Sequence, residues 1–277
     1  MGTLDRTWRL YKESFNVLSA DIEILLFPVM SAVAAIGVAA SFLIPLYRVG
    51  TFEAIHSGAA KWDDYAILFV WYYFNFFVVI FFNAALVGCA NMRLSGGNPT
   101  IGDGLRIATA RLLRILTWTL IATTVGVALQ SLRNRRGLLG GLLGSALGLG
   151  WTLITYLMVP VIVFEDRGIF DSIYRSADLF RKNWGEQVTG SFGFGLLNLV
   201  LLLPGLALGA LLWQADPAAG IIVGVVYMLI LAVVTSAVKG VFTAALYRYA
   251  TSGQAPQGFT ADLIQGSLTR GSRRAWQ

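Results

Sequence analysis

The stretch Ala219–Tyr249 reads AGIIVGVVYMLILAVVTSAVKGVFTAALYRY, and it decides the structural class of this protein. The run of apolar residues is longer than the ~20 residues that an α-helix needs to cross a bilayer. Lys239 is the only charged residue well inside the stretch, and Arg248 lies near its end. We therefore interpret this stretch as a transmembrane helix.

Five similar apolar stretches precede it along the chain: Ile22–Leu46, Tyr65–Ala90, Leu113–Ser131, Leu138–Phe164 and Val188–Trp213. Hydrophobic residues make up 56% of the chain and charged residues 13%, against roughly 25% charged in a soluble domain. This composition excludes a disordered chain and argues against a soluble enzyme. We expect an all-α polytopic membrane protein with six transmembrane helices, forming one membrane domain over residues 22–250.

Residues 1–21 have the pattern of an amphipathic helix. Their apolar residues are spaced by four and three in turn, which keeps them on one helical face: Leu4, Trp8, Tyr11, Phe15 and Leu18. Two later loops have comparable stripes: Ile101, Leu105, Ala108, Leu112 and Ile115, and then Phe170, Ile173, Tyr174, Ala177, Phe180 and Trp184. We expect all three to lie in the membrane interface on the cytoplasmic face. Either the chain repeats one interfacial helix and two spans three times, or any interfacial helix shows such a stripe.

The positions of Lys and Arg predict the orientation in the membrane. Fifteen of the 21 lie on the side of the N-terminus, and five lie on the other side. By the positive-inside rule both termini are cytoplasmic, with the polar tail 251–277 among them. We expect a multi-pass protein of the cell inner membrane. The cluster Arg133, Arg135 and Arg136 on the assigned outer side opposes this orientation.

Three segments carry a family resemblance: Val159–Glu165 (VPVIVFE), Asp171–Ala177 (DSIYRSA) and Ala245–Thr251 (ALYRYAT). Together they resemble an uncharacterised family of prokaryotic six-span integral membrane proteins. The first two, together with Asn183 and Trp184, are also similar, more distantly, to the membrane domain of glycerophosphoryl diester phosphodiesterases. The resemblance implies the fold and the topology. It implies no reaction, because that family has no assigned chemistry. The catalytic domain of those phosphodiesterases is a separate soluble barrel that this sequence lacks, so the resemblance does not imply their activity.

The sequence offers little enzyme chemistry. A single cysteine (Cys89) and a single histidine (His56) exclude an intrachain disulfide and the usual zinc sites. The adjacent acids Glu165 and Asp166 are typical of solvated residues at a helix end, although such a pair could also bind a cation. We expect no catalytic residues, no metal and no cofactor.

Polar residues inside the predicted spans are candidates for lining a path through the membrane. A charge at the bilayer centre costs ~3 kcal/mol on insertion scales, so a buried lysine should be paired or line a cavity. The alternatives are a lysine that extends to the interface and asparagines that bond neighbouring helices. The candidate path residues are Asn75, Asn83, Asn198 and Lys239.

Two further residue sets bear on partners. Glycines at every fourth position predict close helix packing, either within one subunit or between copies in a homo-oligomer: Gly140, Gly144, Gly148, Gly205 and Gly209. Basic residues on the interfacial helices are candidate contacts to lipid headgroups, unless they serve orientation alone: Arg106, Arg111, Arg175, Arg181 and Lys182.

Two functional hypotheses follow from the sequence. The first is a non-enzymatic channel or transporter for a small solute, ion or lipid. The second is a lipid-interacting or scaffolding membrane protein that acts through interfacial helices and oligomerisation. The net charge of +6 indicates contact with anionic lipids rather than with nucleic acid. Membrane lipids are therefore the expected partners in either case.

Overall fold

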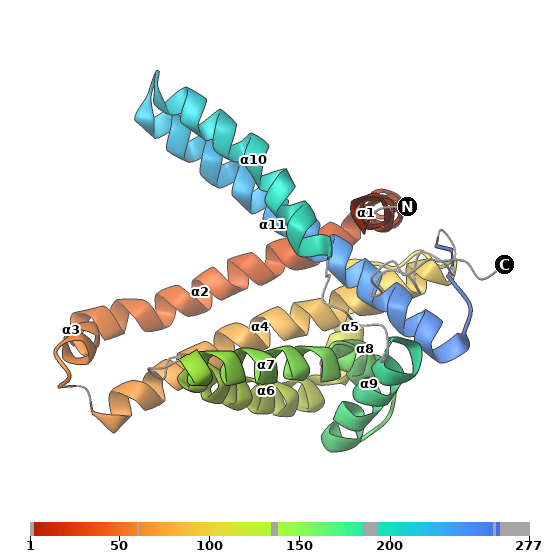
Figure 1. Cartoon of the computed structure of the whole chain (residues 1–277), viewed down its shortest axis with the longest axis horizontal. Coiled ribbons are helices and arrows are strands. Elements are labelled where there is room, and N and C mark those ends of the chain that lie inside the picture. The colour runs from red at the N-terminus through yellow and green to blue at the C-terminus, as the bar shows by residue number, and fades with distance from the viewer. Residues whose placement is uncertain (1–2, 60, 134–137, 185–192, 257–258, 261–277) are drawn as a thin grey trace. The chain divides into compact units, whose positions relative to one another are not determined.

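The computed structural model describes residues 3–59, 61–133, 138–184, 193–256 and 259–260, without the side chains of 3–7, 56, 138–140, 184 and 193–198. Every regular element in these ranges is a helix (Figure 1). The elements are α1 (Thr3–Ser19), η1 (Ile22–Leu25), α2 (Leu26–Arg48), α3 (Thr51–His56), α4 (Trp62–Leu94), α5 (Ile101–Ala110), α6 (Leu112–Arg133), α7 (Leu138–Ile154), α8 (Met158–Phe164), α9 (Ile169–Trp184), α10 (Gly193–Trp213) and α11 (Pro217–Ser252).

Five segments are long and apolar enough to cross a membrane: Ile22–Arg48, Trp62–Leu94, Leu112–Arg133, Gly141–Phe164 and Pro217–Ser252. They correspond to five of the six predicted spans and support a membrane-embedded helical protein. The described part of the remaining predicted span, Val188–Trp213, forms α10 from Gly193 onward. Its described side chains, Leu199–Trp213, make a shorter apolar helix. The sixth span therefore stays a prediction.

The predicted span Leu138–Phe164 is interrupted between α7 and α8. Pro160 accounts for the break, because its ring clashes with the carbonyl four residues earlier and it has no N–H to donate. The buried N–H of Leu157 donates instead to the hydroxyl of Ser176 on α9, at 3.1 Å. Pro204 leaves α10 continuous.

The chain divides into two compact units. The first consists of Met1–Pro28, Leu86–Ile101 and Asp178–Gln277, and the second consists of Val29–Ala85 and Gly102–Ala177. Each unit is described by itself below.

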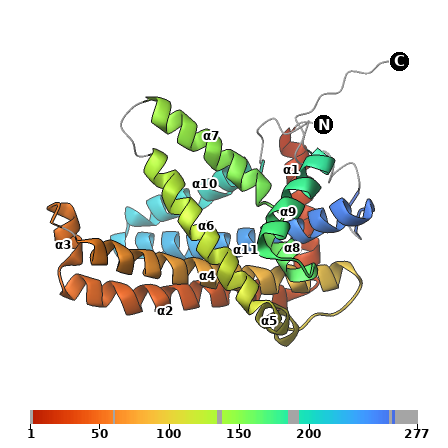
Figure 2. The same cartoon turned by 90° about the horizontal axis from the view of Figure 1, so that it is seen from below.

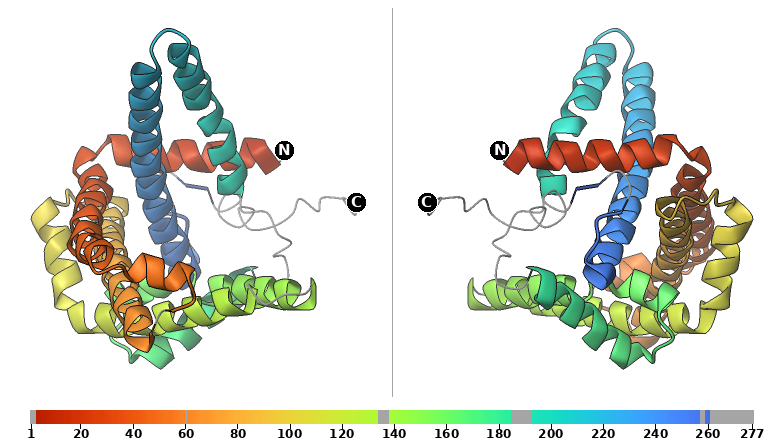
Figure 3. Two further views of the ribbon diagram at one scale, coloured as in Figure 1. Left: turned by 90° about the vertical axis from the view of Figure 1, so that its left-hand side faces the viewer. Right: turned by 90° about the vertical axis from the view of Figure 1, so that its right-hand side faces the viewer.

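In the first unit, α10 and α11 form a hairpin that α1 crosses (Figures 1 and 3). Along its first half α11 exposes large apolar side chains, from Ile221 to Ile230. Along its second half, from Thr235 to Tyr247, most positions are buried. Its 36 residues make a helix of about 54 Å, so it is much longer than the ~30 Å hydrocarbon core of a bilayer.

In the second unit, α6 and α7 lie side by side (Figure 2), with the rings of Trp118 and Trp151 stacked 5.8 Å apart. The hydroxyl of Tyr73 on α4 donates to the carbonyl of Leu116 on α6, at 3.3 Å. Large apolar residues are exposed along α7, whereas α8 is buried at Met158 and from Pro160 to Val163. This change from exposed to buried repeats the pattern of α11.

Candidate functional site

Four arginines surround two acids where α8 ends, in the second unit. We call this group the arginine cluster. Glu165 and Asp166 follow α8 directly, and the helix ends because the backbone of Glu165 is extended. The arginines come from the start of α6 and from α9 with the turn before it. The cluster consists of Arg111, Arg114, Glu165, Asp166, Arg167 and Arg175.

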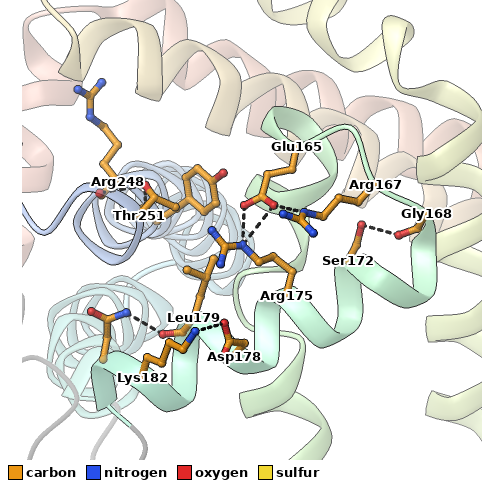
Figure 4. A network of polar contacts seen from close by, with 12 residues as sticks. Glu165, Arg167, Gly168, Ser172, Arg175, Asp178, Leu179, Lys182, Arg248 and Thr251 are labelled. Atoms are coloured by element: carbon orange, nitrogen blue, oxygen red, sulfur yellow. Dashed lines mark hydrogen bonds and ion pairs between the residues drawn. The ribbon is translucent and has the colours of Figure 1, made fainter.

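Glu165 holds the inner part of this cluster. Its carboxylate is 14% exposed and accepts from Nε of Arg175 at 3.0 and 3.2 Å (Figure 4). Arg167, two residues along, donates to the same carboxylate. Charge-assisted bonds of this kind offset the cost of removing a carboxylate from water. They also fix the turn between α8 and α9.

Asp166 holds the outer part. Its Oδ1 accepts from Nη1 of Arg111 at 3.0 Å and from Nη2 of Arg114. The hydrogen bond and charge of Arg114, and then those of Arg111, lower the pKa of the Asp166 carboxyl below its ordinary value. Both arginines also cap α8: Nε of Arg111 donates to the carbonyl of Val163 and Nη1 of Arg114 to that of Glu165. Two of the carbonyls at the end of α8 thereby gain hydrogen-bond donors.

The predicted stripe on α9 divides between two surroundings. Phe170 and Tyr174 are exposed, at 70% and 76%, whereas Phe180 is buried. The most deeply buried positions are Ser172 and Ser176. Small residues allow α9 to approach its neighbours there, and the hydroxyl of Ser172 donates to the carbonyl of Gly168 (Figure 4).

The predicted stripe on α1 divides in the same way. Trp8 and Phe15 are half-exposed, whereas Leu18 is buried together with Leu10 and Ser14. In both helices one edge packs against the protein and a neighbouring aromatic edge stays uncovered.

The remaining candidate headgroup residues are exposed. Arg106 on α5 pairs with Asp103 at 2.9 Å, and its side chain is 78% exposed. Lys182 on α9 pairs with Asp178 at 2.8 Å, and its side chain is 69% exposed. Arg181 is exposed on the same helix. Arg111 and Arg175 differ from these three because they belong to the arginine cluster.

The candidate path residues lie in separate surroundings. The Asn75 amide donates to the carbonyl of Trp71 in its own helix, at 3.0 Å. Asn83, further along the same helix, is half-buried and points about 80° away around the helix axis. Both belong to the second unit, whereas Lys239 is exposed on α11 in the first. The side chain of Asn198 lies outside the described residues.

A comparison with known families matches residues 63–259 to a family of unknown function, DUF6159. The match covers most of the chain. This protein belongs to DUF6159. No curated protein and no solved structure matches it, so the distant resemblance to a phosphodiesterase membrane domain has no support. The region shared with DUF6159 includes the arginine cluster and leaves α1 and α2 outside.

The ALYRYAT segment of this DUF6159 protein has a structural role that sequence reasoning missed. In the first unit, Arg248 donates through Nη1 to the carbonyl of Asn91 at 3.3 Å and to the hydroxyl of Ser95. It thereby caps the end of α4. A polar residue late in an apolar helix was the available signal.

The turn before α2 contains two acidic residues whose contacts were also not predicted from the sequence. The carboxylate of Glu23 accepts from the backbone N–H of Ile101 at 3.0 Å. Asp21 is buried, and its Oδ2 has no hydrogen-bond partner among the described residues. Burial raises the pKa of the Asp21 carboxyl above its ordinary value, although the charge of Arg93 opposes this.

Several glycines of the DUF6159 chain lie where helices approach closely. A Cβ on Gly205 would meet the ring of Tyr227, and one on Gly144 would lie 2.9 Å from the backbone N of Arg133. Gly209 faces Gly220 across the hairpin, and Gly148 lies near the guanidinium of Arg133. Gly140 falls outside the residues whose side-chain surroundings are described. Between α10 and α11, the glycines at positions 205, 209, 220 and 224 line part of an apolar groove of about 930 Å³.

Metal ligands do not gather within the described part of the chain, where no group of three His, Cys, Asp or Glu residues could hold an ion. Cys89 is buried, and its thiol contacts the carbonyl of Thr100 at 3.5 Å. The side chain of His56 lies outside the described residues.

Proposed function

We propose that this protein is a non-enzymatic integral membrane protein that binds lipid headgroups through amphipathic helices lying in the membrane interface. One observation carries the proposal: α9 leaves Phe170 and Tyr174 exposed, at 70% and 76%, on a helix that ends in Arg181 and Lys182. Uncovered aromatic side chains beside basic groups are typical of helices in the boundary between headgroups and acyl chains.

The first helix supports the same interpretation. Trp8 and Phe15 are uncovered on α1, and the basic residues Arg9 and Lys12 are exposed beside them. Tryptophan is favoured at the membrane–water boundary because its ring is amphipathic. In a membrane-embedded protein, each such helix by itself provides a surface for headgroups.

The orientation belongs to the proposal as well. We place both termini and the interfacial helices on the cytoplasmic side of the inner membrane, where anionic lipids attract Lys and Arg. The excess of basic residues on that side supports this placement. Homo-oligomer formation through glycine faces stays a prediction.

The transport hypothesis from the sequence has less support in the geometry. Asn75 uses its amide on its own backbone, and Lys239 is exposed. The groove between α10 and α11 is lined by apolar residues apart from Gln214. Such a lining does not suit a path for a polar solute.

The depth of α9 in the membrane tests the proposal. A spin label at Tyr174→Cys, in a Cys89→Ser background and in phosphatidylglycerol–phosphatidylethanolamine liposomes, reports its exposure to oxygen and to a water-soluble nickel chelate. Labels at Leu149→Cys on α7 and at Gln254→Cys after α11 are the controls for the hydrocarbon core and for water. Both residues are exposed on the protein.

We expect the label at position 174 to lie roughly 5–10 Å into the headgroup and acyl boundary, between the two controls. A label at position 174 that is as accessible to the nickel chelate as the label at position 254 would contradict the proposal.

A further inference from the structure

We infer that Arg111 and Arg114 form a binding site for the phosphate group of an anionic phospholipid, for which Asp166 is a competing internal carboxylate. This inference rests on the proposed lipid-interacting function and assigns it a particular site. The three residues lie together in the second unit.

The two guanidinium groups converge on a single oxygen, Oδ1 of Asp166. An oxyanion held by two arginines is the arrangement that recognises a phosphate oxygen as well as a carboxylate, since both present charged acceptors to the planar N–H fork. A phosphate oxygen in place of Oδ1 would therefore meet the same donors.

Both arginines are held in position independently of Asp166. Arg111 donates through Nε to the carbonyl of Val163 at 3.3 Å, and Arg114 donates through Nη1 to the carbonyl of Glu165 at 3.1 Å. These backbone bonds fix the guanidinium planes. Less side-chain entropy is then lost when an anion binds.

Exposure makes Asp166 replaceable. Its side chain is 78% exposed, whereas those of Arg111 and Arg114 are 27% and 29% exposed. The carboxylate thus lies at the outer rim of a more enclosed pair of cations. One carboxylate against two guanidinium groups leaves one positive charge, which is the charge that a phosphodiester neutralises.

The position along the chain puts the pair at headgroup depth. Arg111 immediately precedes α6, and Arg114 lies in the first turn of this candidate span. Between them, Leu113 is 79% exposed and apolar. If α6 crosses the bilayer, the span begins beside the pair, and lipid phosphates are the anions within reach.

The same chemistry would accept free inorganic phosphate, so the experiment has two arms. In the first, native mass spectrometry counts the lipids retained by the full chain in detergent, with either phosphatidylglycerol or phosphatidylcholine added. In the second, ³¹P NMR linewidths report binding of inorganic phosphate to the same protein without added lipid.

Asp166→Asn is the decisive variant, because it removes the competing charge and leaves both backbone caps of α8 in place. We expect retention of phosphatidylglycerol to increase by about fivefold, as one charge near the surface changes affinity by ~1 kcal/mol. Retention of phosphatidylcholine should change much less, because its choline cation offsets the charge of its phosphate. Arg111→Gln with Arg114→Gln should lower phosphatidylglycerol retention by on the order of 30-fold.

Arg106→Gln is the matched control, because it removes one exposed positive charge from the neighbouring α5. It should change retention far less than the double variant. Should the double variant fail to fold, Asp166→Asn still decides. Unchanged or reduced retention of phosphatidylglycerol in Asp166→Asn would overturn the inference and leave Asp166 as a structural partner.

Binding of inorganic phosphate that equals that of phosphatidylglycerol, and that the double variant removes, would overturn the assignment to lipid. The proposed function fails separately. If the label at position 174 lies in the boundary and Asp166→Asn has no effect, α9 contacts lipid and this phosphate site is wrong.

Discussion

The carboxylate of Glu23, at the start of the first candidate span, accepts a hydrogen bond of 3.0 Å from the backbone N–H of Ile101, 78 residues further along the chain. Ile101 is the first residue of α5. Helices leave their first N–H groups without intrahelical partners, and a carboxylate there also interacts favourably with the helix dipole. Glu23 therefore caps α5 from a distant part of the chain.

Replacing Glu23 with alanine should destabilise the protein by about 1–2 kcal/mol, as the loss of an N-terminal cap does elsewhere. Unfolding in detergent micelles, followed by circular dichroism, would measure the difference. Glu53→Ala on α3 removes an exposed carboxylate and is the matched control. Equal stabilities of the two variants would show that the Glu23 cap contributes nothing.

Arg248 should stabilise the protein by capping the end of α4. Arg248→Gln weakens the bonds to the carbonyl of Asn91 and the hydroxyl of Ser95, so we expect a loss of about 1–3 kcal/mol. The same unfolding assay applies. Arg48→Gln, at the exposed end of α2, is the charge control. Ser95→Ala should have a smaller effect, because the bond to Asn91 remains.

Long runs of apolar residues predicted the membrane spans. These runs alone do not indicate where a span is interrupted. Apolar length and hydropathy predicted six spans, and five of them are long and apolar enough in the structure to cross a membrane. Both properties can be read from neighbouring residues. The break before α8 is explained by Pro160, whose ring and missing N–H interrupt the helix. The hydroxyl of Ser176 on α9, which accepts from the N–H of Leu157 at this break, lies 19 residues further along the chain. No local pattern in the sequence indicates this contact.

The faces of the interfacial helices were predicted only in part. Spacing identified which residues share a stripe, but not which edge of the stripe packs. On α9 the serines at positions 172 and 176 are buried, while Phe170 and Tyr174 are exposed. Hydrophobicity alone predicts that these aromatic residues contact apolar groups, but it does not say whether those groups belong to the protein or to lipid. In a membrane protein both are apolar surroundings.

The arginine cluster could not be predicted from the sequence, because its residues were assigned to separate groups. Arg111 and Arg175 were grouped with exposed basic residues, and the pair Glu165 and Asp166 was interpreted as a solvated helix end. Arg114 and Asp166 are separated by 52 residues, so no periodic pattern connects them. The charges that meet there are determined by the packing of α6, α8 and α9, which only the structure provides.

Gly205 should not tolerate a side chain. A Cβ at this position would meet the ring of Tyr227, whose hydroxyl donates to the carbonyl of Leu201 at 2.6 Å. The ring would have to move and that bond would break, so Gly205→Ala should cost about 1–3 kcal/mol. Gly224→Ala is the control on the same hairpin, because its Cβ would meet no atom within 4 Å. If both variants unfold alike, the hairpin does not depend on this contact.

The stability of the protein should respond to pH through Asp21. Burial raises the pKa of this carboxyl in the folded state, with the charge of Glu23 acting in the same direction and that of Arg93 against it. A raised pKa means that the contribution of Asp21 favours folding fully below the unfolded value, about 3.9. That contribution is lost as pH rises through the folded value. Asp21→Asn should therefore be more stable than the wild type at pH 7.5.

Melting temperatures of both proteins at intervals from pH 7.5 to 4.5 would measure this difference, which should shrink as the pH falls. Asp63→Asn, at an exposed position on α4, controls for the general loss of one negative charge. A wild type more stable than Asp21→Asn at pH 7.5, with an advantage that decreases toward acid, would mean that attraction to Arg93 outweighs burial. The turn between α1 and α2 would then be held by an ion pair instead of being strained by a buried carboxylate.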